Sequence, residues 1–167
     1  MAYRFEEPNM IHHFSIAARD PGHVAAVLAE LLGGQSLNFS PFPGARIVVA
    51  GDEHGTAIEL YPLGLELAPG EGGAAVRGVA NTQPSEFTAT HAAISVALDE
   101  ASVHRIARRE GWRAVTCTRT VAFQVIEFWL ENRVMLEILP PDMARDYLRA
   151  IAPGNLENVA RDSAEPA

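Results

Sequence analysis

A short motif that occurs twice constrains the fold of this chain more than any other feature. The first copy pairs His13 with Glu59, and the second copy pairs His91 with Glu137. The histidine and the glutamate lie 46 positions apart in both copies, and the copies are offset by 78 positions. The same offset aligns further residues of the two halves, namely Ile16 with Ile94, Gly33 with Gly111 and Pro62 with Pro140. This repetition across half of the chain indicates an internal duplication.

The first half predicts a strand, a helix and three further strands. Alternating apolar residues indicate a strand from residue 10 to residue 17. Asp20 is suited to cap a helix that Gly33 ends. Turn signals then separate three short runs that read as strands, at 35–39, 46–50 and 56–61.

The second half repeats this order of elements. A strand is expected over 91–98, and Asp99 begins a helix that Gly111 ends. Three more strands are expected over 112–120, 122–130 and 134–139, and a short helix over 144–151. We therefore expect an α+β fold of two βαβββ modules in tandem. The predicted boundaries are 10–62 for the first module, 63–90 for a linker, 91–140 for the second module and 141–167 for a C-terminal helix and frayed tail.

Strand alternation places the two glutamates on the face opposite to the packing residues. Ile58 and Leu60 flank Glu59, and aliphatic residues flank Glu137 in the same way. Each glutamate then shares a face with the histidine of its own module. A carboxylate inside a cavity lined by a sheet is costly unless it is paired or bound to a metal.

Bulk composition narrows the function. The net charge is −8, which argues against a partner that needs a positive surface, such as nucleic acid or an anionic membrane. The cluster of Arg105, Arg108 and Arg109 is interpreted as a solvated helix flank. One cysteine excludes an intramolecular disulfide, and no run approaches the ~18 apolar residues that a membrane span needs. We expect a soluble, cytoplasmic protein that binds neither nucleic acid nor membrane.

Three stretches resemble the vicinal oxygen chelate superfamily, which includes glyoxalase I, extradiol dioxygenases, and the fosfomycin and bleomycin resistance proteins. They are Ile11-His12-His13 with Asp20 seven residues later, Ala57-Ile58-Glu59-Leu60, and Met135-Leu136-Glu137-Ile138. The resemblance covers about residues 10–140 and implies an eight-stranded open cavity around one divalent metal. The turn Glu131-Asn132-Arg133 departs from the Asp-Pro-Asp-Gly of many members, and no glutathione-binding signature is present. The subfamily is therefore not assigned.

The resemblance implies that His13, Glu59, His91 and Glu137 are the metal ligands. His12 and His13 point to opposite faces of their strand, and His13 is the one on the cavity face. Mixed imidazole and carboxylate ligands suit nickel, cobalt, zinc, iron or manganese, and the sequence does not choose among them. The alternative is an empty polar pocket in which each histidine hydrogen-bonds its glutamate.

Three functions follow from this resemblance. The first is a metal-dependent lyase or isomerase acting on a small oxygenated substrate, with Glu137 or Glu59 as catalytic base. The second is a protein that binds a small molecule or an antibiotic without chemistry. The third is an extradiol dioxygenase, although iron dioxygenases use two histidines and one carboxylate. The resemblance also implies a homodimer.

Overall fold

The computed structural model describes residues 10–40, 42–120, 122–153 and 155 of the 167-residue chain. Residues 1–9 and nearly all of the expected tail lie outside the described residues. The first module comprises β1 (His13–Ala18), α1 (Pro21–Leu32), β2 (Gln35–Asn38), β3 (Arg46–Val49) and β4 (Ala57–Pro62). The second comprises β7 (Ala93–Ser95), α2 (Glu100–Glu110), β8 (Ala114–Thr120), β9 (Phe123–Leu130) and β10 (Val134–Leu139), and α3 (Pro141–Ala150) follows. The α+β fold with two βαβββ units is thus confirmed.

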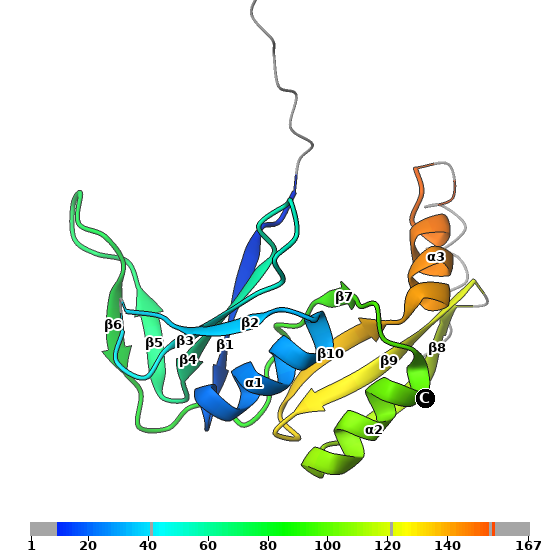
Figure 1. Ribbon diagram of the computed structural model, residues 1–167. Coiled ribbons are helices and arrows are strands. Elements are labelled where there is room, and N and C mark those ends of the chain that lie inside the picture. The colour runs from blue at the N-terminus through cyan, green and yellow to red at the C-terminus, as the bar shows by residue number, and fades with distance from the viewer. Residues whose placement is uncertain (1–9, 41, 121, 154, 156–167) are drawn as a thin grey trace, which may run out of the picture.

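The eight strands of the two units form two separate four-stranded sheets. The strand orders are β1-β4-β3-β2 and β7-β10-β9-β8, with the first pair of strands parallel in each sheet. The two sheets lie in opposite halves of the molecule (Figure 1). In this view α1 lies near the centre and α2 lies below the strands of the second sheet. β1 and β7 are therefore edge strands, and no hydrogen-bonded pairing joins the two sheets within the described ranges.

The offset of 78 residues recurs in the register of the strands. Ser15 pairs with Glu59 between β1 and β4, and Ala93 pairs with Glu137 between β7 and β10. The helix ends repeat as well, because the glycine after each helix adopts the left-handed conformation, with φ of 64° and 68°. Asp20 and Asp99 both accept a backbone hydrogen bond as N-caps, as the sequence predicts.

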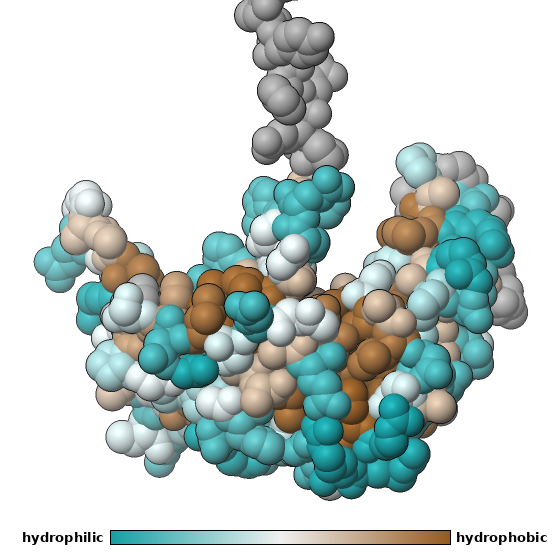
Figure 2. Space-filling view, in the orientation of Figure 1, coloured by the Kyte–Doolittle hydropathy of each residue, from teal (hydrophilic) through white to brown (hydrophobic). Residues whose placement is uncertain are grey.

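Apolar residues of both modules join in one core. Val24, Leu28 and Leu31 of α1 are fully buried with Leu60 of β4, and Val103 and Ile106 of α2 with Leu136 of β10 belong to the same cluster. Apolar residues gather in the middle of the face that Figure 2 shows, whereas the outer side of α2 is hydrophilic. None of the helices within the described residues is long and apolar enough to span a membrane.

The segment at 63–90, which the sequence indicates as a linker without periodicity, contains an antiparallel hairpin. Its strands are β5 (Leu65–Ala68) and β6 (Arg77–Ala80), which pair only with each other. The hairpin projects from the outer side of the first module (Figure 1). Four-residue strands that are mostly exposed leave little hydrophobic alternation, which explains why the sequence gives no signal for them.

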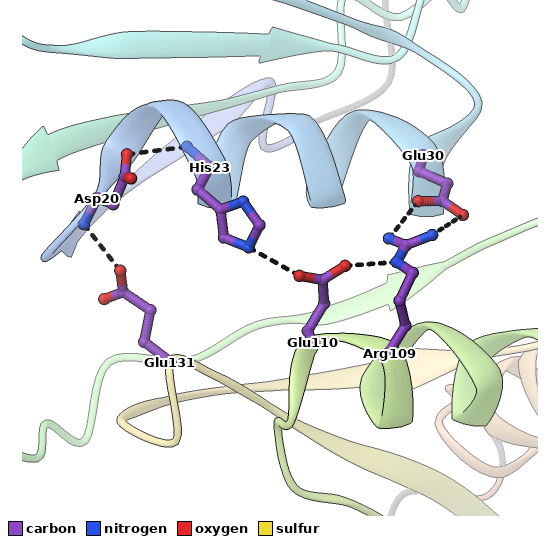
Figure 3. A network of polar contacts seen from close by, with 6 residues as sticks. All are labelled: Asp20, His23, Glu30, Arg109, Glu110 and Glu131. Atoms are coloured by element: carbon purple, nitrogen blue, oxygen red, sulfur yellow. Dashed lines mark hydrogen bonds and ion pairs between the residues drawn. The ribbon is translucent and has the colours of Figure 1, made fainter.

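Polar contacts between the two helices and the β9–β10 turn hold the modules together (Figure 3). The Glu131 carboxylate accepts the backbone N–H groups of Arg19 and Asp20, at 2.7 and 2.8 Å, where α1 begins. A carboxylate is favoured there because the amide groups at a helix start are unpaired and partly positive. The tip of the second module is thereby tied to the first.

Arg109 and Glu110 at the end of α2 form the other part of this contact. Arg109 donates two hydrogen bonds to Glu30 of α1, at 3.0 and 2.7 Å, and Glu110 lies 2.7 Å from His23 Nε2. Burial opposes the charge of Glu110, but the hydrogen bonds from Arg109 and His23 outweigh it and lower the pKa of this carboxyl group. Arg109 was expected to be a solvated flank, and the structure corrects this: it is half exposed but bridges the two modules.

Gly34 gives a testable consequence of the close approach between the end of α1 and β3. A methyl group at Gly34 would overlap the carbonyl oxygen of Val49, whereas one at Gly73 would meet nothing within 4 Å. Overpacking against backbone costs roughly 1–3 kcal/mol or more. We expect Gly34→Ala to lower the free energy of unfolding in urea by that amount and Gly73→Ala to leave it within about 0.5 kcal/mol. Equal stability of the two variants would contradict the packing described.

Candidate functional site

Glu59 lies in the middle of β4, between Ser15 of β1 and Ile47 of β3. Its Oε2 accepts hydrogen bonds from Ser15 Oγ at 2.8 Å and from the Tyr61 hydroxyl at 2.9 Å. Its Oε1 lies 3.7 Å from His13 Nε2. The Glu59 side chain is 13% exposed and that of His13 is 56% exposed, so the carboxylate lies at the base of the site and the imidazole at its rim. Two hydroxyl groups orient one oxygen, and the other faces the histidine.

Tyr61 is held in its neutral form at this site. Burial, followed by the hydrogen bond and the charge of Glu59, raises the pKa of Tyr61 from 10.0 to about 12. The phenol therefore remains a hydrogen-bond donor to Glu59 at all ordinary pH values.

Glu137 occupies the corresponding place in β10, between Ala93 of β7 and Glu127 of β9. Its carboxylate accepts a hydrogen bond from Arg119 Nε at 2.8 Å, and Arg119 Nη2 lies 2.7 Å from the same Oε1. Arg119 also pairs with Glu127 at 2.9 Å. Burial opposes the charge of Arg119, but the hydrogen bonds and charges of Glu137 and Glu127 outweigh it and raise the pKa of Arg119. One guanidinium thus serves two carboxylates, and the cluster carries a net charge of about −1.

His91 lies two residues before β7 and is exposed. Its Nδ1 is 2.9 Å from the carbonyl oxygen of Ala89, so Nδ1 carries the proton in that contact. This tautomer leaves Nε2 with a lone pair, which is the form in which histidine binds a metal.

The structure brings two of the four expected ligands together within one chain. His13 and Glu59 meet, whereas Glu137 contacts Arg119 and His91 contacts its own loop. Across the part of the chain that the structure describes, no group of three or more His, Cys, Asp or Glu residues is placed to hold a metal. A single chain therefore presents two half-sites, at equivalent positions of the two sheets. The four expected ligands do not meet in one cavity of a single chain.

Sequence reasoning missed four residues that contact the glutamates. Ser15 lies two residues after His13 on β1, and Tyr61 lies two residues after Glu59 on β4. Alternation therefore places each of them on the face of its neighbour, but it does not predict which atoms they contact. Arg119 and Glu127 had no such signal, because their meeting depends on how β8 and β9 are aligned.

The donor atoms of the first half-site suit a divalent metal. Bonds of about 2.1 Å, arranged at 90° to 120° around one ion, place two donor atoms roughly 3.0–3.6 Å apart. His13 Nε2 and Glu59 Oε1 are 3.7 Å apart, close to that range. Glu137 fits less directly, since Arg119 already holds the oxygen that an ion would take. Binding there requires the guanidinium to move toward Glu127.

Comparison with known proteins identifies the fold. No model of a protein family and no curated protein matches the sequence. Among solved structures, the fosfomycin resistance protein FosX from Listeria monocytogenes, crystallised with Mn(II) and sulfate, superimposes with a TM-score of 0.55 at 12% identity, over 86% of this chain and 98% of that one. A glyoxalase family protein from Bacillus anthracis superimposes with a TM-score of 0.51 at 13% identity, over 79% and 94% of the two chains. Both neighbours are members of the vicinal oxygen chelate superfamily.

The chain has the vicinal oxygen chelate fold. At such low identities the likeness establishes the fold alone. Within this vicinal oxygen chelate fold, the glutamate of each half-site lies on the last strand of its βαβββ unit.

Tyr61→Phe tests the hydrogen bonds that orient Glu59. In the folded protein Tyr61 keeps its proton up to a pKa of about 12, whereas the unfolded chain releases it near 10.0. The free energy of unfolding should therefore fall as pH rises between these values, because the unfolded state binds fewer protons there. We expect ultraviolet titration to show one phenol ionising late, and Tyr61→Phe to remove that late step. Tyr147→Phe is the control, and loss of the late step in that variant instead would contradict the assignment.

Proposed function

We propose that this protein is a metal-dependent enzyme of the lyase or isomerase class, acting on a small oxygenated substrate that chelates the ion. The observation that carries the proposal is the His13–Glu59 pair, in which hydrogen bonds from Ser15 and Tyr61 orient the carboxylate of Glu59. The histidine and glutamate recur in the second module with the same strand register for the glutamate. Among the fold neighbours, a mutant of the Listeria monocytogenes FosX was crystallised with Mn(II) and 1S,2S-dihydroxypropylphosphonic acid.

The four ligands of the proposal are His13, Glu59, His91 and Glu137. When bound, the ion supplies Lewis acidity that stabilises negative charge on the oxygens of the substrate. Glu59 is the better placed of the two carboxylates to accept a proton. Its Oε1 receives no hydroxyl donor, and among the described residues it has no arginine partner, so protonation breaks no ion pair with an arginine. Tyr61, which stays protonated, keeps the other oxygen in place during the transfer.

We further propose that the protein acts as a homodimer in which each site combines the first module of one chain with the second module of the other. Support comes from the separation of the half-sites, because the described residues of one chain supply no third ligand beside His13 and Glu59. A twofold axis relating two chains would produce two such sites of equal composition.

Arg119 supports a second candidate function, a binding protein that works without metal. The guanidinium already pairs with both Glu137 and Glu127, so the second half-site has a counter-ion of its own without a metal. In that case the two cavity faces would hold a small molecule by hydrogen bonds alone.

Metal content separates these two functions. We expect elemental analysis of protein purified without chelator to find about one equivalent of a transition metal per chain, and His13→Ala or His91→Ala to hold less than about a tenth, since each removes one of four ligands. His54→Ala, which changes a histidine in an exposed turn, should retain the metal. Metal affinity should fall as pH drops, because ligands must be deprotonated.

Absence of metal in this experiment would contradict the proposed enzyme. Wild-type protein without metal, even after reconstitution, would remove the enzyme as described and favour the binding protein. If metal is present, turnover of a hemithioacetal against cleavage of a catechol distinguishes the lyase from the dioxygenase. Glu59→Gln should then abolish turnover while the folded structure, followed by circular dichroism, is kept.

Mixing two inactive variants tests the shared site. A heterodimer of one His13→Ala chain and one His91→Ala chain contains one intact site, which combines the unchanged first module of the His91→Ala chain with the unchanged second module of the His13→Ala chain. After unfolding and refolding together at equal concentration, half of the dimers are heterodimers, so metal content should return to about a quarter of the wild-type value. Recovery of none, in a sample shown to be dimeric, would contradict a site shared between chains.

A further inference from the structure

Arg133 is the one residue with a charged side chain that is buried within the part of the chain that the structure describes, with an exposure of 4%. It follows the tip of the β9–β10 turn, where Glu131 and Asn132 adopt positive φ values of 51° and 56°. This left-handed turn directs the chain back into the molecule at the start of β10, so Arg133 lies at the junction of both modules and the 63–90 segment.

The contacts of Arg133 leave its charge uncompensated. Nη1 donates to the carbonyl oxygen of Ala17 at 3.2 Å, Nη2 donates to that of Ser85 at 3.4 Å, and Nε has no partner. Both distances are at the long end of the range for hydrogen bonds. Among the described residues no carboxylate forms an ion pair with it, although a guanidinium cannot release its proton.

Three other arginines of the chain show the opposite arrangement. Arg19, Arg109 and Arg119 have side chains that are 49%, 52% and 32% exposed, and each pairs with at least one carboxylate. Desolvation makes a partner most necessary for the most buried charge. Arg133 is the most buried of these arginines and lacks such a partner, so its surroundings suit an anion that the chain itself does not supply.

A cavity of about 230 Å³ lies against Arg133. Four hydroxyl-bearing residues line it, namely Ser15, Ser85, Thr88 and Thr90. Its volume is many times the roughly 10–15 Å³ that a cavity needs to hold one water molecule, so a small polyatomic ion fits. Glu66 also lines the cavity, but this exposed carboxylate accepts a hydrogen bond from Asn81 and is not among the partners of Arg133 in the described part of the chain.

We infer that this cavity binds a small oxyanion, such as a carboxylate, phosphonate or phosphate group. A guanidinium presents paired N–H groups that match two oxygens of such a group, and the hydroxyl groups of Thr88 and Thr90 can donate to the others. Ser15 lines the cavity and also donates to Glu59. If the proposed function holds, on which this step rests, the anion is the acidic group of the substrate, and the substrate class is a small oxygenated acid.

Calorimetry on metal-free protein tests this inference independently of metal binding. Inorganic phosphate, methylphosphonate and acetate are titrated separately into wild-type protein, Arg133→Gln and Arg105→Gln. Arg105 is an exposed arginine of α2 that does not line the cavity, so its variant makes the same change of charge outside the proposed site. We expect at least one of the three anions to bind wild-type protein and Arg105→Gln equally, and not to bind Arg133→Gln.

Two results would overturn the inference: no binding of any of the three anions to wild-type protein, or equal binding to a folded Arg133→Gln. If Arg133→Gln does not fold, Thr90→Val decides, because it removes a hydroxyl at an exposed position and keeps the side-chain shape. Loss of one hydrogen bond to a charged group should then weaken binding about tenfold, and an unchanged affinity would overturn the inference. If the protein binds an anion but no metal, the proposed enzyme is contradicted and the anion site stands. If it binds metal but none of the three anions, only the anion site is contradicted.

Discussion

Each sheet has one face that must pack under a helix, and this requirement determines where the two glutamates point. Ile58 and Leu60 are 1% and 0% exposed on the helix side of β4, so Glu59 between them faces the other way. The same holds for Glu137 in β10. A shift of one residue in either strand would place a carboxylate in the core and expose the aliphatic side chains. The cost of that exchange keeps the register, and with it the half-sites, in place.

The local pattern of the sequence was sufficient for the two βαβββ units. Helix caps, glycine stops and strand alternation act within a few residues, and the structure confirms Asp20, Asp99, Gly33 and Gly111 in these roles. The pairing of His13 with Glu59 also followed, because parallel strands β1 and β4 place them on one face. The assembly of all four expected ligands did not follow, since it depends on how the units are placed relative to each other.

Contacts between the modules could not be read from local periodicity. Glu131 reaches backbone groups 111 and 112 residues earlier in the chain, and Arg109 reaches a glutamate 79 residues earlier. Such contacts depend on the docking of finished units, and a charged helix face looks the same in the sequence whether water or another module covers it. Arg119 was hidden for a different reason. The alignment of β8 with β9 is irregular between Thr118 and Thr120, and alternation alone cannot foresee a bulge.

The position of Arg119 determines which cation would balance the carboxylates of the second module when no metal is bound. An empty site that contains only carboxylates repels itself and favours a loosened sheet, whereas Arg119 gives the second module an internal counter-ion that keeps its strands together. Under the proposed function, an ion would take the place of Arg119 beside Glu137, and Glu127 would keep its contact with the guanidinium. The second module therefore holds a cation before any metal is bound, and under the proposed function folding and metal loading would be separate events.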